Sequence, residues 1–129
     1  MTASQFLHKA SQAASSARLL VDANDTEGAC NRAYYAMFDA AKAALMLVGA
    51  PAEFIESKSH AGVLQGFSLH VVKTGLLPAD LGRALKRVED LRGAADYTSR
   101  EIPMEKAKWA LEAAEAFVKA AKGMARSAE

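Results

Sequence analysis

Cysteine, aromatic residues and net charge are all scarce in this sequence. The 129 residues include one cysteine, aromatic residues make up 7%, and the formal net charge is +1. The single cysteine, Cys30, cannot form a disulfide within the chain. Residues 1–10 also contain no apolar segment of the kind found in signal peptides. These two absences predict a protein of the reducing cytoplasm.

Long apolar runs and strong electrostatic fields are missing as well. The longest apolar stretch, around residues 43–48, is far shorter than the roughly 20 residues that span a bilayer. We therefore expect no membrane span. A net charge near zero gives no global signal for a nucleic-acid partner, although a local basic groove on an oligomer remains compatible with it.

Catalytic and metal-binding motifs are also absent. No Ser-His-Asp or Cys-His order and no Gly-rich phosphate loop occurs. His60 and His70 lie ten residues apart and Cys30 is distant from both, so they lack the spacing of a helical metal pair. We expect neither a metal nor a cofactor.

What the sequence does have is alanine at helical spacing. Alanine is the residue with the best helix propensity, and apolar residues that recur every three to four positions are typical of amphipathic helices. Gly49 and Pro51 form one clear stop, and Gly75 another. The pattern predicts a single domain over residues 1–129, an all-α antiparallel up-and-down bundle of four to five helices. The predicted helices cover residues 4–21, 25–48, 58–74, 78–96 and 103–124.

The second predicted helix carries a polar stripe beside its apolar face. Arg32, Tyr35 and Asp39 are spaced by three and four residues, so they share one side of the helix, where Arg32 and Asp39 could bracket the Tyr35 hydroxyl. The plain interpretation is a surface ion pair beside a packing tyrosine. The alternative makes this side a dimer interface or a nucleotide-binding groove.

Two further segments contain candidate site residues. Lys58 and His60 lie at the start of the third predicted helix, where Ser57 or Ser59 can cap the helix and a phosphate could bind its N-terminus. Near the end of the fourth helix, Arg92 and Asp96 are i, i+4 neighbours and Tyr97 follows. An ordinary helical ion pair with a packing tyrosine would explain this second group equally well.

Taken together, four segments resemble the HEPN family, specifically its small stand-alone branch. They are RAYYAMF at 32–38, KSHAGV at 58–63, VKTGLLP at 72–78 and LRGAADY at 91–97. Each is modestly specific, but their order and separation make chance similarity improbable, and the resemblance covers about residues 28–124. It implies a homodimeric bundle of four or five helices, often paired with a minimal nucleotidyltransferase in a toxin–antitoxin system.

The same resemblance implies a possible active site with one departure. Many HEPN proteins are metal-independent RNases whose motif is an arginine followed four to six residues later by a histidine. Arg92 matches the arginine, but Asp96, Tyr97 and Thr98 stand where the histidine is expected. Because an unperturbed tyrosine has a pKa near 10, Tyr97 would be a poor general base. Either His60 or His70 enters the cleft instead, or Tyr97 accepts AMP from the partner.

The sequence thus supports three hypotheses. The leading one is a HEPN subunit that acts with a minimal nucleotidyltransferase and binds nucleotide or RNA in a cleft of its dimer. The second is a metal-independent endoribonuclease toxin, and the third a non-catalytic dimerisation module. The predicted cleft residues are Arg32, Tyr35, Asp39, Lys58, Arg92 and Tyr97, and the catalytic candidates are Arg92, Asp96, Tyr97 and His60.

Overall fold

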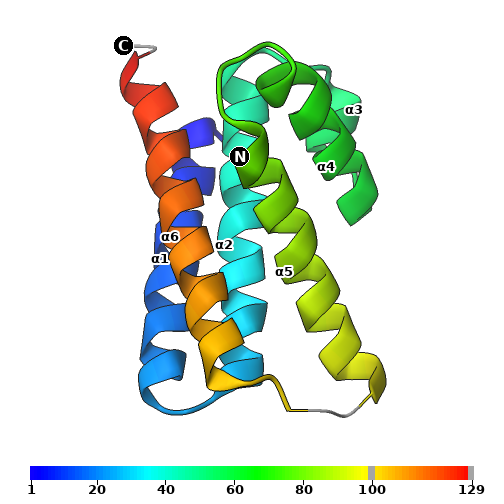
Figure 1. The fold of residues 1–129 in the computed structure, drawn as a ribbon. Coiled ribbons are helices and arrows are strands. Elements are labelled where there is room, and N and C mark those ends of the chain that lie inside the picture. The colour runs from blue at the N-terminus through cyan, green and yellow to red at the C-terminus, as the bar shows by residue number, and fades with distance from the viewer. Residues whose placement is uncertain (99–100, 128–129) are drawn as a thin grey trace.

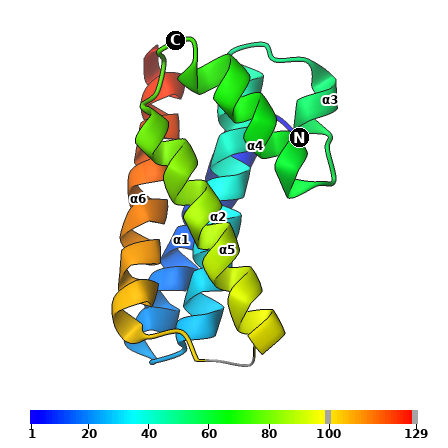
Figure 2. The same ribbon diagram turned by 45° about the vertical axis from the view of Figure 1, so that its right-hand side comes forward.

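A bundle of long helices forms the body of the molecule (Figure 1). The computed structural model describes the backbone of residues 1–98 and 101–127, and the side chains of residues 1–94 and 101–127. Helices α1, α2, α5 and α6 run alternately in opposite directions, whereas α3 and α4 lie against one end of the bundle (Figures 1 and 2). The elements are α1 (Ala3–Asp22), α2 (Thr26–Leu47), α3 (Ala52–Ile55), α4 (His60–Phe67), the π-helical turn η1 (Ser68–Val72), α5 (Ala79–Thr98) and α6 (Met104–Ser127).

The predicted all-α antiparallel bundle is confirmed, with three differences in detail. The short helix α3 was not predicted, because four residues are too few to show a helical period. The predicted helix over residues 58–74 is α4 followed by η1, in which the backbone widens to a π-helical turn. The fourth predicted helix, over residues 78–96, was too short, since α5 continues to Thr98 and neither Gly nor Pro interrupts the chain there.

Side-chain caps define the starts of the helices that carry the site. The Asp25 side chain accepts a hydrogen bond of 2.9 Å from the Gly28 backbone N–H and caps α2. The Ser59 hydroxyl accepts one of 2.9 Å from the Gly62 N–H and caps α4. Of the two serines predicted as caps, Ser59 is therefore the one that is used.

Helix α2 is the centre of the bundle and contacts every other helix. Its apolar face has small side chains, so the neighbouring helices approach closely. Cys30 also lies on this face, and burial raises the pKa of its thiol to about 11. The buried residues of α2 are Ala29, Cys30, Ala33, Tyr34, Ala36, Met37, Ala40, Ala41, Ala43, Ala44 and Leu45.

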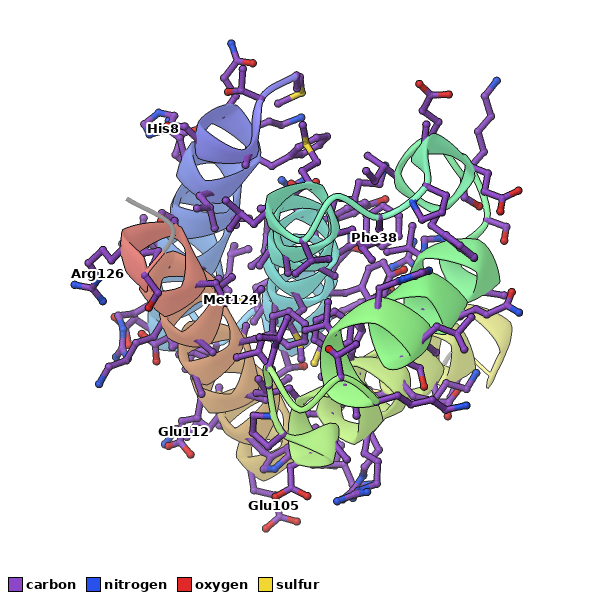
Figure 3. The ribbon with its side chains drawn as sticks, turned by 90° about the horizontal axis from the view of Figure 1, so that it is seen from above. His8, Phe38, Glu105, Glu112, Met124 and Arg126 are labelled. Atoms are coloured by element: carbon purple, nitrogen blue, oxygen red, sulfur yellow. The ribbon has the colours of Figure 1, made fainter. Side chains whose placement is uncertain are left out.

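Helix α6 closes the bundle against α1 and α2. Its apolar residues are buried at helical spacing, while Glu105, Glu112 and Arg126 project outward (Figure 3). Arg18 of α1 donates two hydrogen bonds of 2.8 Å to the Glu115 carboxylate and so ties α1 to α6 at the surface. Exposed pairs of this kind contribute little to stability, so apolar packing holds α6 in place. Over the described residues, no helix is long and apolar enough to cross a bilayer.

The turn after α2 depends on a glycine with a left-handed backbone. Gly49 has φ +69°, and a Cβ atom built there would meet nothing within 4 Å. We predict that Gly49→Ala lowers the free energy of unfolding by about 1 kcal/mol, because only backbone strain opposes the substitution. Gly123 in α6 has equal free space but helical geometry. The matched variant Gly123→Ala should raise the free energy of unfolding by about 0.5–1 kcal/mol. Urea titration would measure both variants. A lower free energy of unfolding in both would contradict the backbone explanation.

Tyr34 is an unusual member of the core because its polar atom has no partner. Its side chain is 1% exposed, and its buried hydroxyl makes no hydrogen bond to any residue whose side chain the structure describes. An unpaired buried hydroxyl costs roughly 1–3 kcal/mol, so the rest of the core must offset this cost.

Replacing this tyrosine by phenylalanine tests that cost. We predict that Tyr34→Phe raises the free energy of unfolding by about 1 kcal/mol, since the apolar ring is kept and the unpaired hydroxyl is removed. Tyr35→Phe is the matched control: Tyr35 is half-buried, and its variant should stay within about 0.5 kcal/mol of the parent. Urea unfolding followed by circular dichroism would measure both. A loss of stability in Tyr34→Phe would show that the hydroxyl is bonded after all.

Candidate functional site

Four polar or aromatic side chains from α2 and α5 meet on one side of the bundle. Arg92 of α5 donates a hydrogen bond of 2.6 Å from Nε to Oδ1 of Asn31 on α2. Its guanidinium carbon lies 5.5 Å from the centre of the Tyr35 ring, and the guanidinium of Arg32 lies at the same distance from that ring. We call Asn31, Arg32, Tyr35 and Arg92 the arginine–tyrosine cluster. Two cations thus share one aromatic ring, an arrangement favoured by the ring's electron-rich face.

A layer of aromatic rings connects this cluster to α4. Tyr34 packs edge-on against Tyr35 at 5.6 Å between ring centres and stacks with Phe38 at 5.8 Å. The His60 ring lies 5.0 Å from Tyr34 and 5.2 Å from Phe38. Figure 3 shows Phe38 on the side of α2 that faces α3 and α4. Arg92 also contacts this layer, with its guanidinium carbon 4.9 Å from the Tyr34 ring centre.

An open groove of about 970 Å³ runs beside the cluster between α1 and α2. On α2 it is bordered by Arg32, Tyr35 and Asp39, and on α1 by polar side chains that include Lys9 and Gln12. Burial raises the pKa of the Asp39 carboxyl above its ordinary value, and the positive charges of Lys9 and Lys42 oppose part of that rise. The groove is therefore mixed in charge, with Arg32 at the tyrosine ring and Lys9 close enough to act on Asp39.

A smaller pocket of about 390 Å³ borders Arg92. Two carboxylates, Asp25 and Glu27, border it together with Asn31 and Arg92. An anion would meet these carboxylates there, so the electrostatics favour its approach to Arg92 from the Arg32 side. An anion is therefore expected to reach the arginine–tyrosine cluster from the side of Arg32 and not from the side of the two carboxylates.

The structure brings together most of the residues predicted for the cleft. Arg32, Tyr35 and Arg92 are in contact, and Asp39 borders the same groove. Arg32 lies over the face of Tyr35, and no hydrogen bond to the tyrosine hydroxyl is found among the described side chains, so the predicted bracketing of that hydroxyl is not what forms.

The remaining predicted residues have different outcomes. His60 joins the site through its contact with Tyr34. Lys58, which precedes His60 by two residues, is exposed and does not border the groove. The side chains of Asp96 and Tyr97 lie outside the described residues. Within the described part of the chain, no group of three or more His, Cys, Asp or Glu residues is placed to hold a metal ion.

Two parts of the site were not predicted. Asn31 stands four residues before Tyr35, so its place on the same helix face was visible in the sequence, but its bond to Arg92 depends on how α5 packs. The wall formed by α1, including Lys9 and Gln12, carries no local signal, because it arises from the pairing of α1 with α2.

Comparisons with known proteins agree with this architecture. Residues 3–124 match the family described as HEPN domain. A Methanocaldococcus jannaschii protein named "Putative toxin MJ0605" is 36% identical over 104 residues, which cover 81% of this chain and 74% of that protein. A UPF0332 protein of Gloeobacter violaceus is 35% identical over 91 residues, 70% of this chain and 68% of the relative.

A second M. jannaschii relative, also named as a toxin in the same terms, is 29% identical over 115 residues. The matched region covers 88% of this chain and 75% of that relative. The family match extends over nearly the whole bundle, and it includes the helices α2, α4 and α5 that carry the arginine–tyrosine cluster and His60. The chain therefore belongs to the HEPN domain family.

Proposed function

We propose that this chain is the toxin-like HEPN component of a toxin–antitoxin pair, that it acts with a minimal nucleotidyltransferase, and that its arginine–tyrosine cluster binds the phosphates and bases of RNA or a nucleotide. The observation that carries the proposal is the convergence of Arg32 and Arg92, from two helices, on the Tyr35 ring. Relatives named as toxins support the toxin-like role.

The chemistry of the cluster suits a phosphate-containing ligand. A guanidinium has five N–H donors in a planar fork that matches phosphate oxygens, and the bond to Asn31 uses one donor of Arg92 and sets the direction of its plane. A partly exposed tyrosine ring beside these cations can stack on a base, as aromatic rings do in proteins that bind single-stranded RNA.

The position of the cluster supports a ligand that is longer than one phosphate. Arg32 and Tyr35 border the groove between α1 and α2, and its α1 wall adds Lys9, Gln12 and Ser15. A phosphate held between the two arginines would place the adjoining nucleoside in this groove, where hydroxyl and amide groups can bond to its polar edges. The carboxylates Asp25 and Glu27 border the smaller pocket at Arg92 and disfavour an anion there.

Arg92→Lys tests the phosphate-binding role. Lysine keeps the charge but loses the planar fork and the Nε donor to Asn31, so we predict about a tenfold loss of affinity for a short single-stranded RNA. Arg87→Lys is the matched control, because Arg87 lies on the same helix and also covers an aromatic ring, that of Trp109, at 4.9 Å. Fluorescence anisotropy with a labelled oligonucleotide would measure both. Equal affinities of the two variants would remove Arg92 from the site.

The partner is tested by a mass measurement. The purified chain is incubated with ATP and the nucleotidyltransferase encoded beside its gene, and its intact mass is then recorded. We predict a mass gain of one or more AMP units that is lost in Tyr97→Phe and kept in Tyr35→Phe. If the neighbouring enzyme neither binds the chain nor increases its mass, the nucleotidyltransferase part of the proposal is refuted. The RNA-binding part would still depend on its own measurement.

A second candidate function, a metal-independent endoribonuclease, is favoured by one observation. His60 contacts the same tyrosine ring, that of Tyr34, as Arg92 does. A histidine is thus present near the arginine, although it does not follow Arg92 in the sequence.

A further inference from the structure

Helix α6 has two halves of different charge. Residues 104–115 contain three carboxylates and two lysines, whereas residues 116–127 contain three cations and no carboxylate. These cations, Lys119, Lys122 and Arg126, are exposed, and none of them forms an ion pair within the described part of the chain. The net charge of +1 therefore conceals a basic region at the end of α6.

The first half of α1 extends this basic region. Residues 1–17 contain His8 and Lys9 but no Asp or Glu. Because α1 and α6 are neighbours that run in opposite directions, this half of α1 lies beside the basic half of α6. Figure 3 shows His8 and Arg126 on the same side of the molecule, whereas Glu105 projects in another direction. The two halves together form one cationic side of the bundle.

A hollow of about 290 Å³ lies between the two helices in this region. Lys119, Lys122 and Arg126 border it from α6, and Ser11 and Ser15 border it from α1. We call these five residues the basic surface. The same two serines border the groove between α1 and α2, so the hollow and the groove adjoin across α1.

The carboxylates that border the hollow and the groove are faced by cations of their own. Glu115 borders the hollow, and Arg18 donates two hydrogen bonds of 2.8 Å to its carboxylate. Asp39 borders the groove, and the charges of Lys9 and Lys42 act on it. The cations of the basic surface have no such partner among the described residues, so their charge is available to a ligand.

From this arrangement we propose that the ligand is a single-stranded RNA of several nucleotides, whose backbone continues from the arginine–tyrosine cluster along the groove and across α1 to the basic surface. The inference rests on the proposed binding at the cluster, and it selects a polynucleotide over a free nucleotide. An acidic protein would also meet complementary charge here, but the continuity of the hollow with the groove favours a flexible chain that occupies both.

The spacing of the cations suits a chain of phosphates. Lys119, Lys122 and Arg126 follow one another at i, i+3 and i+7, so they share one side of α6 over about 10 Å of its axis. No aromatic ring borders the hollow among the described residues. The basic surface therefore contacts phosphates and does not stack on bases, so it adds affinity without sequence preference. Base stacking stays at Tyr35.

The first half of α6 provides a matched control. Lys106 and Lys108 are exposed on the same helix but do not border the hollow. The double variants Lys119→Gln/Lys122→Gln and Lys106→Gln/Lys108→Gln remove the same charge, so an effect of net charge alone would be equal in both. Circular dichroism would confirm that both variants fold.

The test measures the affinity of the purified protein for a labelled dinucleotide and for a labelled single-stranded RNA of about 12 nucleotides, within the range that one single-strand-binding fold covers. We expect the parent to bind the longer RNA at least tenfold more tightly. Lys119→Gln/Lys122→Gln should lose about tenfold in affinity for the longer RNA and less than twofold for the dinucleotide. Its plot of log affinity against log salt should be less steep by about 1.4, the value for two lost phosphate contacts. Lys106→Gln/Lys108→Gln should match the parent within twofold on both.

The outcomes distinguish this inference from the proposed function. Equal affinity of the parent for the two RNAs, or equal losses in the two double variants, overturns the basic surface as an RNA site and leaves binding at the arginine–tyrosine cluster in place. Absence of binding of either RNA by the parent overturns the RNA part of the proposed function and this inference with it.

Discussion

Close packing of the alanine-rich face of α2 is the constraint on which the rest of the structure depends. Because the buried side chains on this face are mostly methyl groups, α1, α5 and α6 can all lie directly against one helix. Across one of these interfaces Arg92 of α5 forms a direct hydrogen bond to Asn31 of α2. A larger residue at Ala33 or Ala36, which are fully buried, would push the neighbouring helices away and change the site before it changed the fold.

The aromatic residues interrupt this alanine face at one place, and the polar chemistry gathers there. Tyr34, Tyr35 and Phe38 fill the space where α4 meets α2, and their rings provide flat faces for Arg32, Arg92 and His60. The rings exclude water from one side of each charged or titratable group while the other side stays open. Such a setting strengthens interactions with a phosphate relative to a fully solvated surface.

The sequence predicted the fold well because the fold depends on local patterns. The apolar periodicity over residues 103–124 and the stop at Gly49 are properties of short segments, and both were confirmed. The missed elements, α3 and the π-helical character of η1, depend on how the chain between α2 and α5 packs on α2, which no local period records.

The site was predicted only in part, for a related reason. Arg32 and Tyr35 share a helix face and could be paired from spacing alone, whereas the contact of Arg92 with both tyrosines requires the α2–α5 packing. The interaction of His60 with Tyr34 joins residues from two helices that are separated by α3 and a loop. The placement of Asp39 on the groove was foreseen, but the α1 wall facing it was not.

The segment between α2 and α5 has a consequence for the dynamics of the molecule. It consists of the short helices α3 and α4 and the turn η1, and it covers only one end of the bundle (Figure 2). Its two helices are too short to be stable alone, and the segment stays in place because Val63, Phe67 and Val71 are fully buried against the bundle. The Phe67 ring also packs on that of Phe117 in α6, at 5.1 Å between ring centres. An opening that moved His60 away from Arg92 of α5 would therefore expose part of the core as well.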